Sequence, residues 1–190
     1  MLLKILLMIT LLITCFSATA LAASSGVYEY TSKNLGYKIT CPIKPLVKFE
    51  AGAKRELLVF SSRGGKVTLG FQITFDAFDS KSTPDFNKAD EKTLNEYLEN
   101  FRAENVYEYV GINKITQDNK GVMLINAGEI EVKGDDGEVE GVLTAEQQGV
   151  FVFFRTNKGR CVEVELIVEN LEEEDILNFR KSLYTFTDTK

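Results

Sequence analysis

Two stretches near the end of the chain decide the fold: Gln148-Gly-Val-Phe-Val-Phe-Phe154 and Cys161-Val-Glu-Val-Glu-Leu-Ile-Val-Glu169. Both have the length and the β-branched and aromatic content that are typical of strands. The segment between them, Arg155-Thr-Asn-Lys-Gly-Arg160, contains Asn and Gly, which tolerate the positive φ of a hairpin loop. The sequence therefore predicts an antiparallel hairpin at the centre of the fold.

The side chains of this hairpin indicate how its sheet is covered. The first strand is apolar on both faces, which is typical of a central strand with other elements packed on both sides. The second strand alternates between two faces, with apolar side chains on one and glutamates on the other. The apolar set is Val162, Val164, Leu166 and Val168, and the acidic set is Glu163, Glu165 and Glu169.

Further strands are predicted on both sides of a mid-chain helix. Alternating apolar residues and turn signals indicate strands at 37–41, 46–49, 56–61 and 66–75, and again at 107–115, 121–127, 129–133 and 138–140. Thr83-Pro84 could open one helical turn with Pro at its first position, and Asp90-Glu91 offers a second start for the helix between them. Its apolar stripe falls at i, i+3, i+4 and i+7 and consists of Leu94, Tyr97, Leu98 and Phe101.

A second helix is predicted at 171–184, with Asn170 as its cap and Glu173 as the acid of a capping box. Its buried stripe is Ile176, Phe179 and Leu183. The expected fold class is therefore α+β. It has a central antiparallel sheet of about six to eight strands, with a mid-chain helix and a C-terminal helix packed on it.

The first 22 residues have the composition of a secretory signal peptide. Lys4 supplies a positive start, residues 5–13 are an apolar run too short for a membrane span, and Ala20-Leu21-Ala22 forms a cleavage site. The alternative is a lipobox that ends at Cys15, but Thr14 is an unusual residue before a lipidated cysteine. We expect cleavage after Ala22 and a secreted or periplasmic protein without a transmembrane segment. A lead-in at 23–34 then precedes a single domain at 35–190.

Cys41 and Cys161 are the two cysteines that remain after this cleavage. An exported chain with an even number of cysteines often forms a disulfide, so this pair is the disulfide candidate. The alternative is two free thiols, because Cys also packs as a small apolar residue. Cys161 falls on the glutamate face of its strand. Sequence does not supply the Cα separation that a disulfide requires, so both alternatives stay open.

The order of elements resembles that of a known family. A Gly-Tyr-strand-Pro start at 36–42 is followed by a hairpin, a Leu-Tyr-Leu-Phe helix, a run of antiparallel strands and a C-terminal helix that ends Ser182-Leu-Tyr-Thr-Phe186. This order is similar to the PsbP/Mog-type fold, whose members include photosystem II extrinsic subunits, a Ran-binding protein and many exported bacterial domains. The resemblance covers most of residues 35–187. It implies a central antiparallel sheet and, in most members, binding without catalysis, but it assigns no binding residue here.

The composition excludes several classes of function. The chain has no His, which excludes Ser-His-Asp and Cys-His catalysis and every metal site that contains His. No catalytic residue is therefore proposed. The formal net charge is −6, which argues against nucleic acid as a partner because phosphate contacts need a basic surface.

Six acidic residues of one predicted hairpin are the candidate metal ligands, because grouped carboxylates can hold Ca²⁺. Their spacing does not match an EF-hand loop, and turns are rich in Asp and Gly for backbone reasons alone. A solvated acidic face without any cofactor is the favoured interpretation. The candidates are Glu129, Glu131, Asp135, Asp136, Glu138 and Glu140.

We expect an exported, non-catalytic binding or accessory domain of the cell envelope, which acts on a protein partner or a small ligand. The alternative is a His-independent hydrolase or transferase that uses carboxylates. Four tyrosines among polar residues could form a recognition surface, although edge-strand positions are the commoner outcome, so no surface site is named. They are Tyr28, Tyr30, Tyr107 and Tyr109.

Overall fold

The computed structural model describes residues 27–104, 109–126, 129–133, 139–144 and 148–190. Side chains are described for residues 27–100, 109–126 and 148–190. The predicted signal peptide and the alternative lipobox at Cys15 lie outside the described residues. Within these residues, no helix has the length and apolar character needed to cross a membrane.

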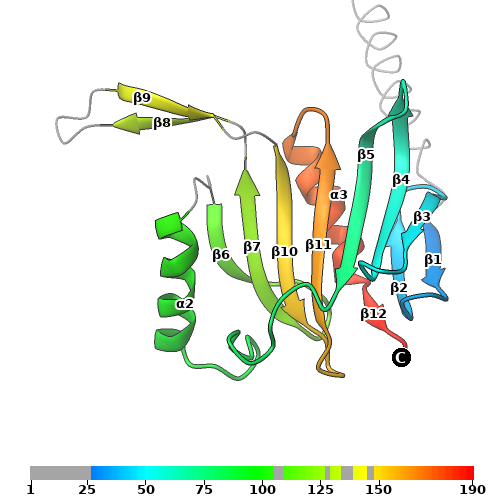
Figure 1. The fold of residues 1–190 in the computed structure, drawn as a ribbon, viewed down its shortest axis with the longest axis horizontal. Helices are drawn as coiled ribbons and strands as arrows, with labels where there is room; N and C mark the ends of the chain where they lie inside the picture. Colours follow the sequence, from blue (N-terminus) through cyan, green and yellow to red (C-terminus); the bar gives the residue numbers. More distant parts are fainter. Residues whose placement is uncertain (1–26, 105–108, 127–128, 134–138, 145–147) are drawn as a thin grey trace, which may run out of the picture.

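A seven-stranded antiparallel sheet forms the centre of the molecule, in the order β3-β4-β5-β11-β10-β7-β6 (Figure 1). This confirms the predicted α+β class and its sheet. The hairpin of β10 and β11 lies in the middle, with β7 paired to β10 and β5 paired to β11. The strands are β3 (Leu46–Glu50), β4 (Arg55–Arg63), β5 (Lys66–Phe75), β6 (Tyr109–Lys114), β7 (Lys120–Asn126), β10 (Gly149–Arg155) and β11 (Cys161–Val168).

The central hairpin has the two faces that its sequence predicts. Val162, Val164 and Leu166 of β11 are buried in the main core, whereas Glu163 and Glu165 are half-buried on the opposite face. Alternation continues in β10, where one face belongs to the main core and the other to a second, smaller apolar cluster. Both faces of β10 are therefore covered, as expected for a central strand.

Helix α3 (Glu173–Tyr184) packs on one face of the sheet and passes behind it in Figure 1. Phe179 and Leu183 of its predicted stripe are fully buried. A small sheet of β1 (Tyr28–Ser32), β2 (Tyr37–Cys41) and β12 (Thr187–Asp188) joins the same core. Tyr37 of β2 stacks on Phe186, with 5.3 Å between ring centroids.

Helix α2 (Glu91–Glu104) packs on the other face, over β6 and β7. Leu94, Tyr97 and Leu98 contact the small cluster, as their spacing predicts. The carboxylate of Asp90 accepts a hydrogen bond from the Thr93 N–H at 2.7 Å, which is the geometry of an N-cap. The helix therefore starts after Asp90, and the earlier start at Thr83-Pro84 is not used.

The start of α3 corrects the predicted cap. The helix begins at Glu173, and its capping box is formed by Glu172 and Asp175 instead of Asn170 and Glu173. Leu171 explains the shift, because its side chain packs against the core and its N–H donates to Gln148 Oε1 at 3.0 Å. Those contacts hold the chain outside the helix until Glu172.

The N-terminal part of the described chain is also a correction. Residues 28–34 were expected to be a lead-in, but Tyr28–Ser32 is strand β1 and pairs with β2 along its whole length. Its sequence, Tyr-Glu-Tyr-Thr-Ser, is too polar to indicate a strand, and its partner is outside the main sheet.

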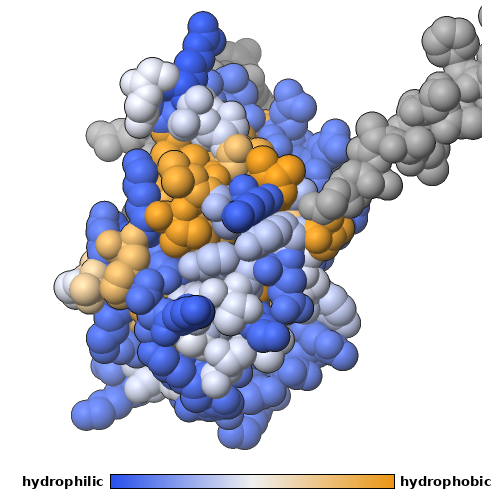
Figure 2. All heavy atoms as spheres, turned by 90° about the vertical axis from the view of Figure 1, so that its right-hand side faces the viewer, coloured by the Kyte–Doolittle hydropathy of each residue, from blue (hydrophilic) through white to orange (hydrophobic). Residues whose placement is uncertain are grey.

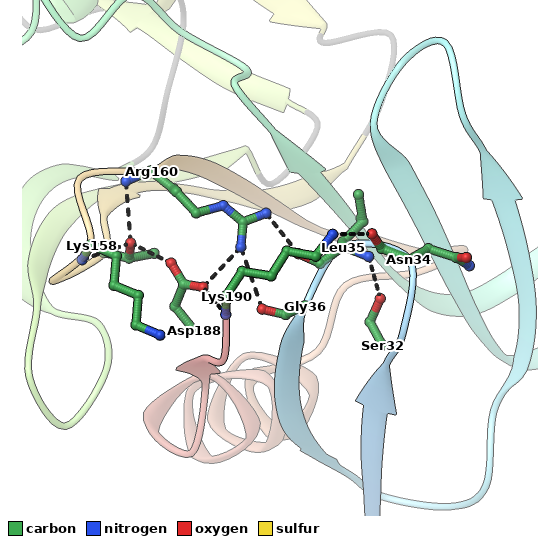
Figure 3. A network of polar contacts seen from close by, with 9 residues as sticks. Ser32, Asn34, Leu35, Gly36, Lys158, Arg160, Asp188 and Lys190 are labelled. Carbon is green, nitrogen blue, oxygen red and sulfur yellow. Dashed lines mark hydrogen bonds and ion pairs between the residues drawn. The ribbon is translucent and has the colours of Figure 1, made fainter.

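The small sheet is attached to the β10–β11 loop by a polar network (Figure 3). Arg160 donates to Asp188 Oδ1 at 2.8 Å and to the Leu35 carbonyl at 2.7 Å. Thr156 donates to the other oxygen of Asp188, also at 2.7 Å. The guanidinium of Arg160 lies over the Phe75 ring, 3.7 Å from its centroid. This network connects β12, the turn between β1 and β2, and the central hairpin.

A separate hairpin of β8 (Glu129–Lys133) and β9 (Val139–Thr144) forms a two-stranded sheet. Figure 1 shows it beyond the ends of β7 and β10. Its first strand has the predicted bounds, and its second strand is longer than the predicted 138–140.

Candidate binding groove

Helix α3 packs on one face of the large sheet, and α2 packs on the other face over β6 and β7. On the α3 side, a groove lies between the C-terminal half of α3 and the ends of β6 and β7. Its volume is about 540 Å³, which is within the range of small-molecule sites. We therefore describe it as the candidate binding groove.

One stripe of α3 forms a wall of this groove. Leu177, Arg180, Lys181 and Tyr184 lie at i, i+3, i+4 and i+7, which places them on one side of the helix. The neighbouring stripe with Phe179 and Leu183 anchors the helix in the main core. Anchoring one stripe directs the other toward the groove. The sequence contains this spacing, but its mixture of apolar and basic residues does not stand out as a binding pattern.

The floor of the groove is apolar. Ile115, Met123 and Leu183 line it, and each is buried. Leu177 and Tyr184 line the side, where they are 51% and 49% exposed. Large apolar side chains that remain this exposed next to a buried floor are a feature of interaction sites.

The rim of the groove is cationic. Lys114 comes from the end of β6, and Arg180 and Lys181 come from the last turns of α3. Among the described residues, none of these three side chains has an ion pair or a side-chain hydrogen bond. Three cationic residues without ion-pair partners among the described residues therefore line one groove of a chain whose net charge is −6.

Backbone hydrogen bonds hold the two walls of the groove together. The Gln117 N–H donates to the Tyr184 carbonyl at 3.1 Å, which connects the β6–β7 turn to the end of α3. The Ile115 N–H donates to the Asn119 carbonyl at 2.9 Å within that turn. Since both walls are tied to the same turn, the groove is held open by the fold itself.

Two other surfaces are less informative. Ile43, Leu46 and Phe49 are exposed on or next to edge strand β3, and Figure 2 shows apolar atoms gathered on that side of the molecule. A polar cleft of about 440 Å³ includes Asp85 and Arg155. Lys88 is paired with Asp85 and holds the pKa of Asp85 below its usual value, and Arg155 donates to the Ser80 and Thr83 carbonyls. The cleft therefore combines charges of both signs, whereas the charged residues of the groove are all cations.

Glu163 and Glu165 on β11 do not show the divergent pKa shifts of an acid/base pair. Burial raises the pKa of Glu163 and of Glu165, and the proximity of Glu163 adds to the shift at Glu165. Arg55 lowers both pKa values in part. An acid/base pair needs carboxyls whose pKa values are moved apart, whereas these two shift in the same direction for the same reason.

A fully buried carboxylate, Glu56, is the residue that sequence reasoning missed. It accepts hydrogen bonds from the Tyr37 hydroxyl at 2.9 Å and the Ser32 hydroxyl at 2.8 Å. Tyr30 and Asn34 donate to it at 3.1 and 3.2 Å. All four donors come from β1, β2 and their turn, so Glu56 joins the small sheet to β4. The sequence did contain a signal for this buried site, because Glu56 is an acidic residue at an inward-facing position of the strand predicted at 56–61.

The two candidate cysteines are free and buried in separate surroundings. Cys41 belongs to the main core, where burial raises its pKa to about 12. Cys161 starts β11 on the glutamate face, and its neighbours include Arg155, Asp76 and Asp79. The structure therefore gives no support to the candidate disulfide. Cys161 is buried in spite of lying on that face.

The candidate Ca²⁺ ligands remain a prediction. Glu129 and Glu131 lie on β8 and Glu140 lies on β9, but their side chains are not described. Asp135, Asp136 and Glu138 lie outside the described residues. In the part of the chain that is described, no group of three or more potential metal ligands occurs.

The three described tyrosines of the four do not form one surface. Tyr28 and Tyr30 are on β1, where both pack against the main core. Tyr109 is on β6, at the other edge of the large sheet, and Tyr107 lies outside the described residues. Tyr109 is on the strand whose last residue, Lys114, lines the groove.

Comparisons with known proteins add a similarity of fold. No protein-family model and no curated protein matches the chain. Among solved structures, the chain is similar to the solution structure of cyanobacterial PsbP (CyanoP) from Synechocystis sp. PCC 6803, with 12% sequence identity and a TM-score of 0.49. The similarity covers 87% of this chain and 94% of that one. A likeness of this degree assigns neither a family nor a function.

Proposed function

We propose that the protein is an exported, non-catalytic binding domain of the cell envelope, and that the groove between α3 and the ends of β6 and β7 is its binding site. One observation carries the proposal. Lys114, Arg180 and Lys181 line the same groove, none of them has an ion-pair partner among the described residues, and the buried floor of the groove is apolar. A site with apolar area and a few convergent polar groups is the usual form of a ligand site.

The cellular location in this proposal rests on the N-terminal sequence. The positive start, the apolar run and the Ala20-Leu21-Ala22 site are the features of an exported chain. Export would place the groove in the periplasm or outside the cell, where its partner is either another envelope protein or a small ligand.

The experiment is photo-cross-linking in the native cells. A photo-reactive p-benzoylphenylalanine replaces Leu177 in the groove, and the matched control carries it at Glu96, which is exposed on α2. Adducts of any size are identified by mass spectrometry of the envelope fraction. We expect a reproducible adduct from position 177 that is absent from position 96. It should also be lost when Arg180→Glu and Lys181→Glu are added, because reversing two rim charges repels an anionic occupant. Identical adducts from both positions, or none from 177, would contradict the proposal.

A further inference from the structure

The groove has a charged end and an apolar continuation. Its cations lie where β6 and α3 both end, at Lys114, Arg180 and Lys181. From there the same face of the sheet continues along β7 through Met123 to Ile125, which is paired with Tyr109 of β6. Tyr109 is five positions before Lys114, which corresponds to about 16 Å along a strand.

The ring of Tyr109 lies against this face of the sheet and does not project away from it. A Cβ atom at Gly111 would be 2.4 Å from the Tyr109 hydroxyl oxygen, so the ring occupies the space that Gly111 leaves free. Its hydroxyl accepts a hydrogen bond from Asn113 Nδ2 at 2.9 Å. With the ring held down in this way, Tyr109 and Ile125 contribute apolar side-chain area to this face, and the bonded Asn113 amide and Tyr109 hydroxyl are its polar part.

The floor and walls of the groove present side chains to an occupant. The N–H and C=O groups of a strand lie in the plane of its sheet, so the backbone groups of edge strand β6 that are not paired with β7 point outward from the sheet edge and not into the groove over the α3 face. The wall of α3 is helical, and the turn between β6 and β7 is bonded internally and to Tyr184. An extended peptide lying in the groove would have to leave its own N–H and C=O groups without protein partners. A hydrocarbon chain has no such requirement, and the thioether of Met123 adapts to its shape.

We infer that the occupant is a monomeric long-chain fatty acid, which is a deepening of the proposed function and rests on it. Its carboxylate lies among Lys114, Arg180 and Lys181, and its hydrocarbon chain passes Leu177 and Met123 toward Tyr109. A free monomer is favoured over a membrane surface, because a chain with net charge −6 is repelled by anionic lipids at long range.

The test is isothermal titration calorimetry on the naturally processed protein purified from cells, with dodecanoate as the probe. Dodecanoate supplies both the anionic head and the chain, 1-dodecanol supplies only the chain, and hexanoate supplies the head with a short chain. We expect saturable binding of dodecanoate and binding at least about tenfold weaker for each of the other two, since each lacks one half of the interaction. Equal affinity for all three probes would overturn the inference.

Variants assign the binding to the groove. Arg180→Gln with Lys181→Gln should weaken dodecanoate binding about tenfold, because it removes two of the three cations. Arg63→Gln with Lys66→Gln is the matched loss of two charges at exposed positions beside the β4–β5 turn, outside the groove, and should leave the affinity unchanged. Leu177→Asp, at a half-exposed position that folding tolerates, should abolish binding by placing a charge beside the chain. Unchanged affinity in the groove variants would place the ligand elsewhere and overturn the inference.

A vesicle-binding experiment distinguishes failure of this inference from failure of the proposed function. The protein is co-sedimented with vesicles of phosphatidylglycerol and phosphatidylcholine. If it binds the vesicles, loses this binding when Arg180 and Lys181 are substituted, and does not bind monomeric dodecanoate, the occupant of the groove is a membrane surface and the fatty-acid inference is overturned. A groove-dependent protein adduct in the cross-linking experiment, again without dodecanoate binding, would keep the binding function and overturn only the ligand. Failure of both experiments would overturn both.

Discussion

At the scale of single residues, the main stabilising polar feature is Glu56. A carboxylate has four acceptor sites, and here four donors from β1, β2 and their turn occupy them. Removing one partner of a buried hydrogen bond leaves the other unsatisfied, at a cost of about 1–3 kcal/mol for each group. Glu56 is therefore more sensitive to substitution than its type suggests.

The first prediction concerns Glu56→Gln, which keeps the shape and replaces one acceptor oxygen by a donor. Because the new amide faces hydroxyl and amide donors, we expect the free energy of unfolding to fall by about 2–4 kcal/mol. Chemical denaturation at neutral pH measures this change. The matched control is Glu165→Gln on β11, where the half-buried carboxylate accepts one hydrogen bond from Gln72. A loss at Glu56 no larger than that at Glu165 would show that the four-donor cluster does not stabilise the fold.

At the scale of elements, the short strand β12 depends on its polar network. Only two residues form it, so its ladder alone is too short to hold the chain in place. Asp188, whose side chain is 5% exposed, joins it to Arg160 and Thr156. The pair is a charge-assisted hydrogen bond at a partly desolvated site, which is the stronger class of such interactions.

The second prediction is that Asp188→Ala lowers the free energy of unfolding by about 2–4 kcal/mol, because it leaves the Arg160 guanidinium without its anion. Thermal unfolding and denaturant titration measure the effect. Glu29→Ala is the control, since the Lys38–Glu29 pair has a distance of 3.3 Å but is exposed on both sides. Exposed pairs contribute at most about 1 kcal/mol. Equal losses in the two variants would argue against a stabilising role for the network.

At the scale of the whole molecule, the core between the two sheets contains groups that resist ionisation. Burial raises the pKa of Cys41 to about 12 and also raises the pKa of Tyr37 and Tyr30, with the nearby Glu56 charge adding to both tyrosine shifts. The ordinary pKa values are 9.0 for the thiol and 10.0 for the phenols. The unfolded chain therefore releases these protons at lower pH than the folded chain does.

The third prediction follows from that difference. Stability from a group whose pKa is raised on folding is present below its unfolded pKa and is lost as the pH rises toward its folded pKa. We expect the free energy of unfolding to be constant near pH 8 and to fall progressively from pH 9 to pH 12. Denaturant titrations across this range measure it, and Cys41→Ala should give a shallower fall because one titrating group is removed. An equally steep fall in that variant would remove Cys41 from the explanation.

Local patterns predicted much of the sheet. Strands 37–41, 66–75 and 129–133 have the bounds that alternation and turn residues indicate. At the β4–β5 turn, Gly64 and Gly65 have φ of 59° and 82°, the positive values that such a hairpin requires. The start of α3 was misplaced because a tertiary contact of Leu171 overrides the local capping signal at Asn170.

The sequence by itself determined the α+β class, the central hairpin and the anchoring stripes of both helices, because periodicity reports which side of an element faces a core. Tertiary structure alone decided the small sheet, the surroundings of Glu56, the separate sites of Cys41 and Cys161, and the groove. Lys114 and the cations of α3 are far apart in the chain. Their proximity depends on the position of β6 at the sheet edge and on how α3 crosses the sheet, which local patterns do not encode.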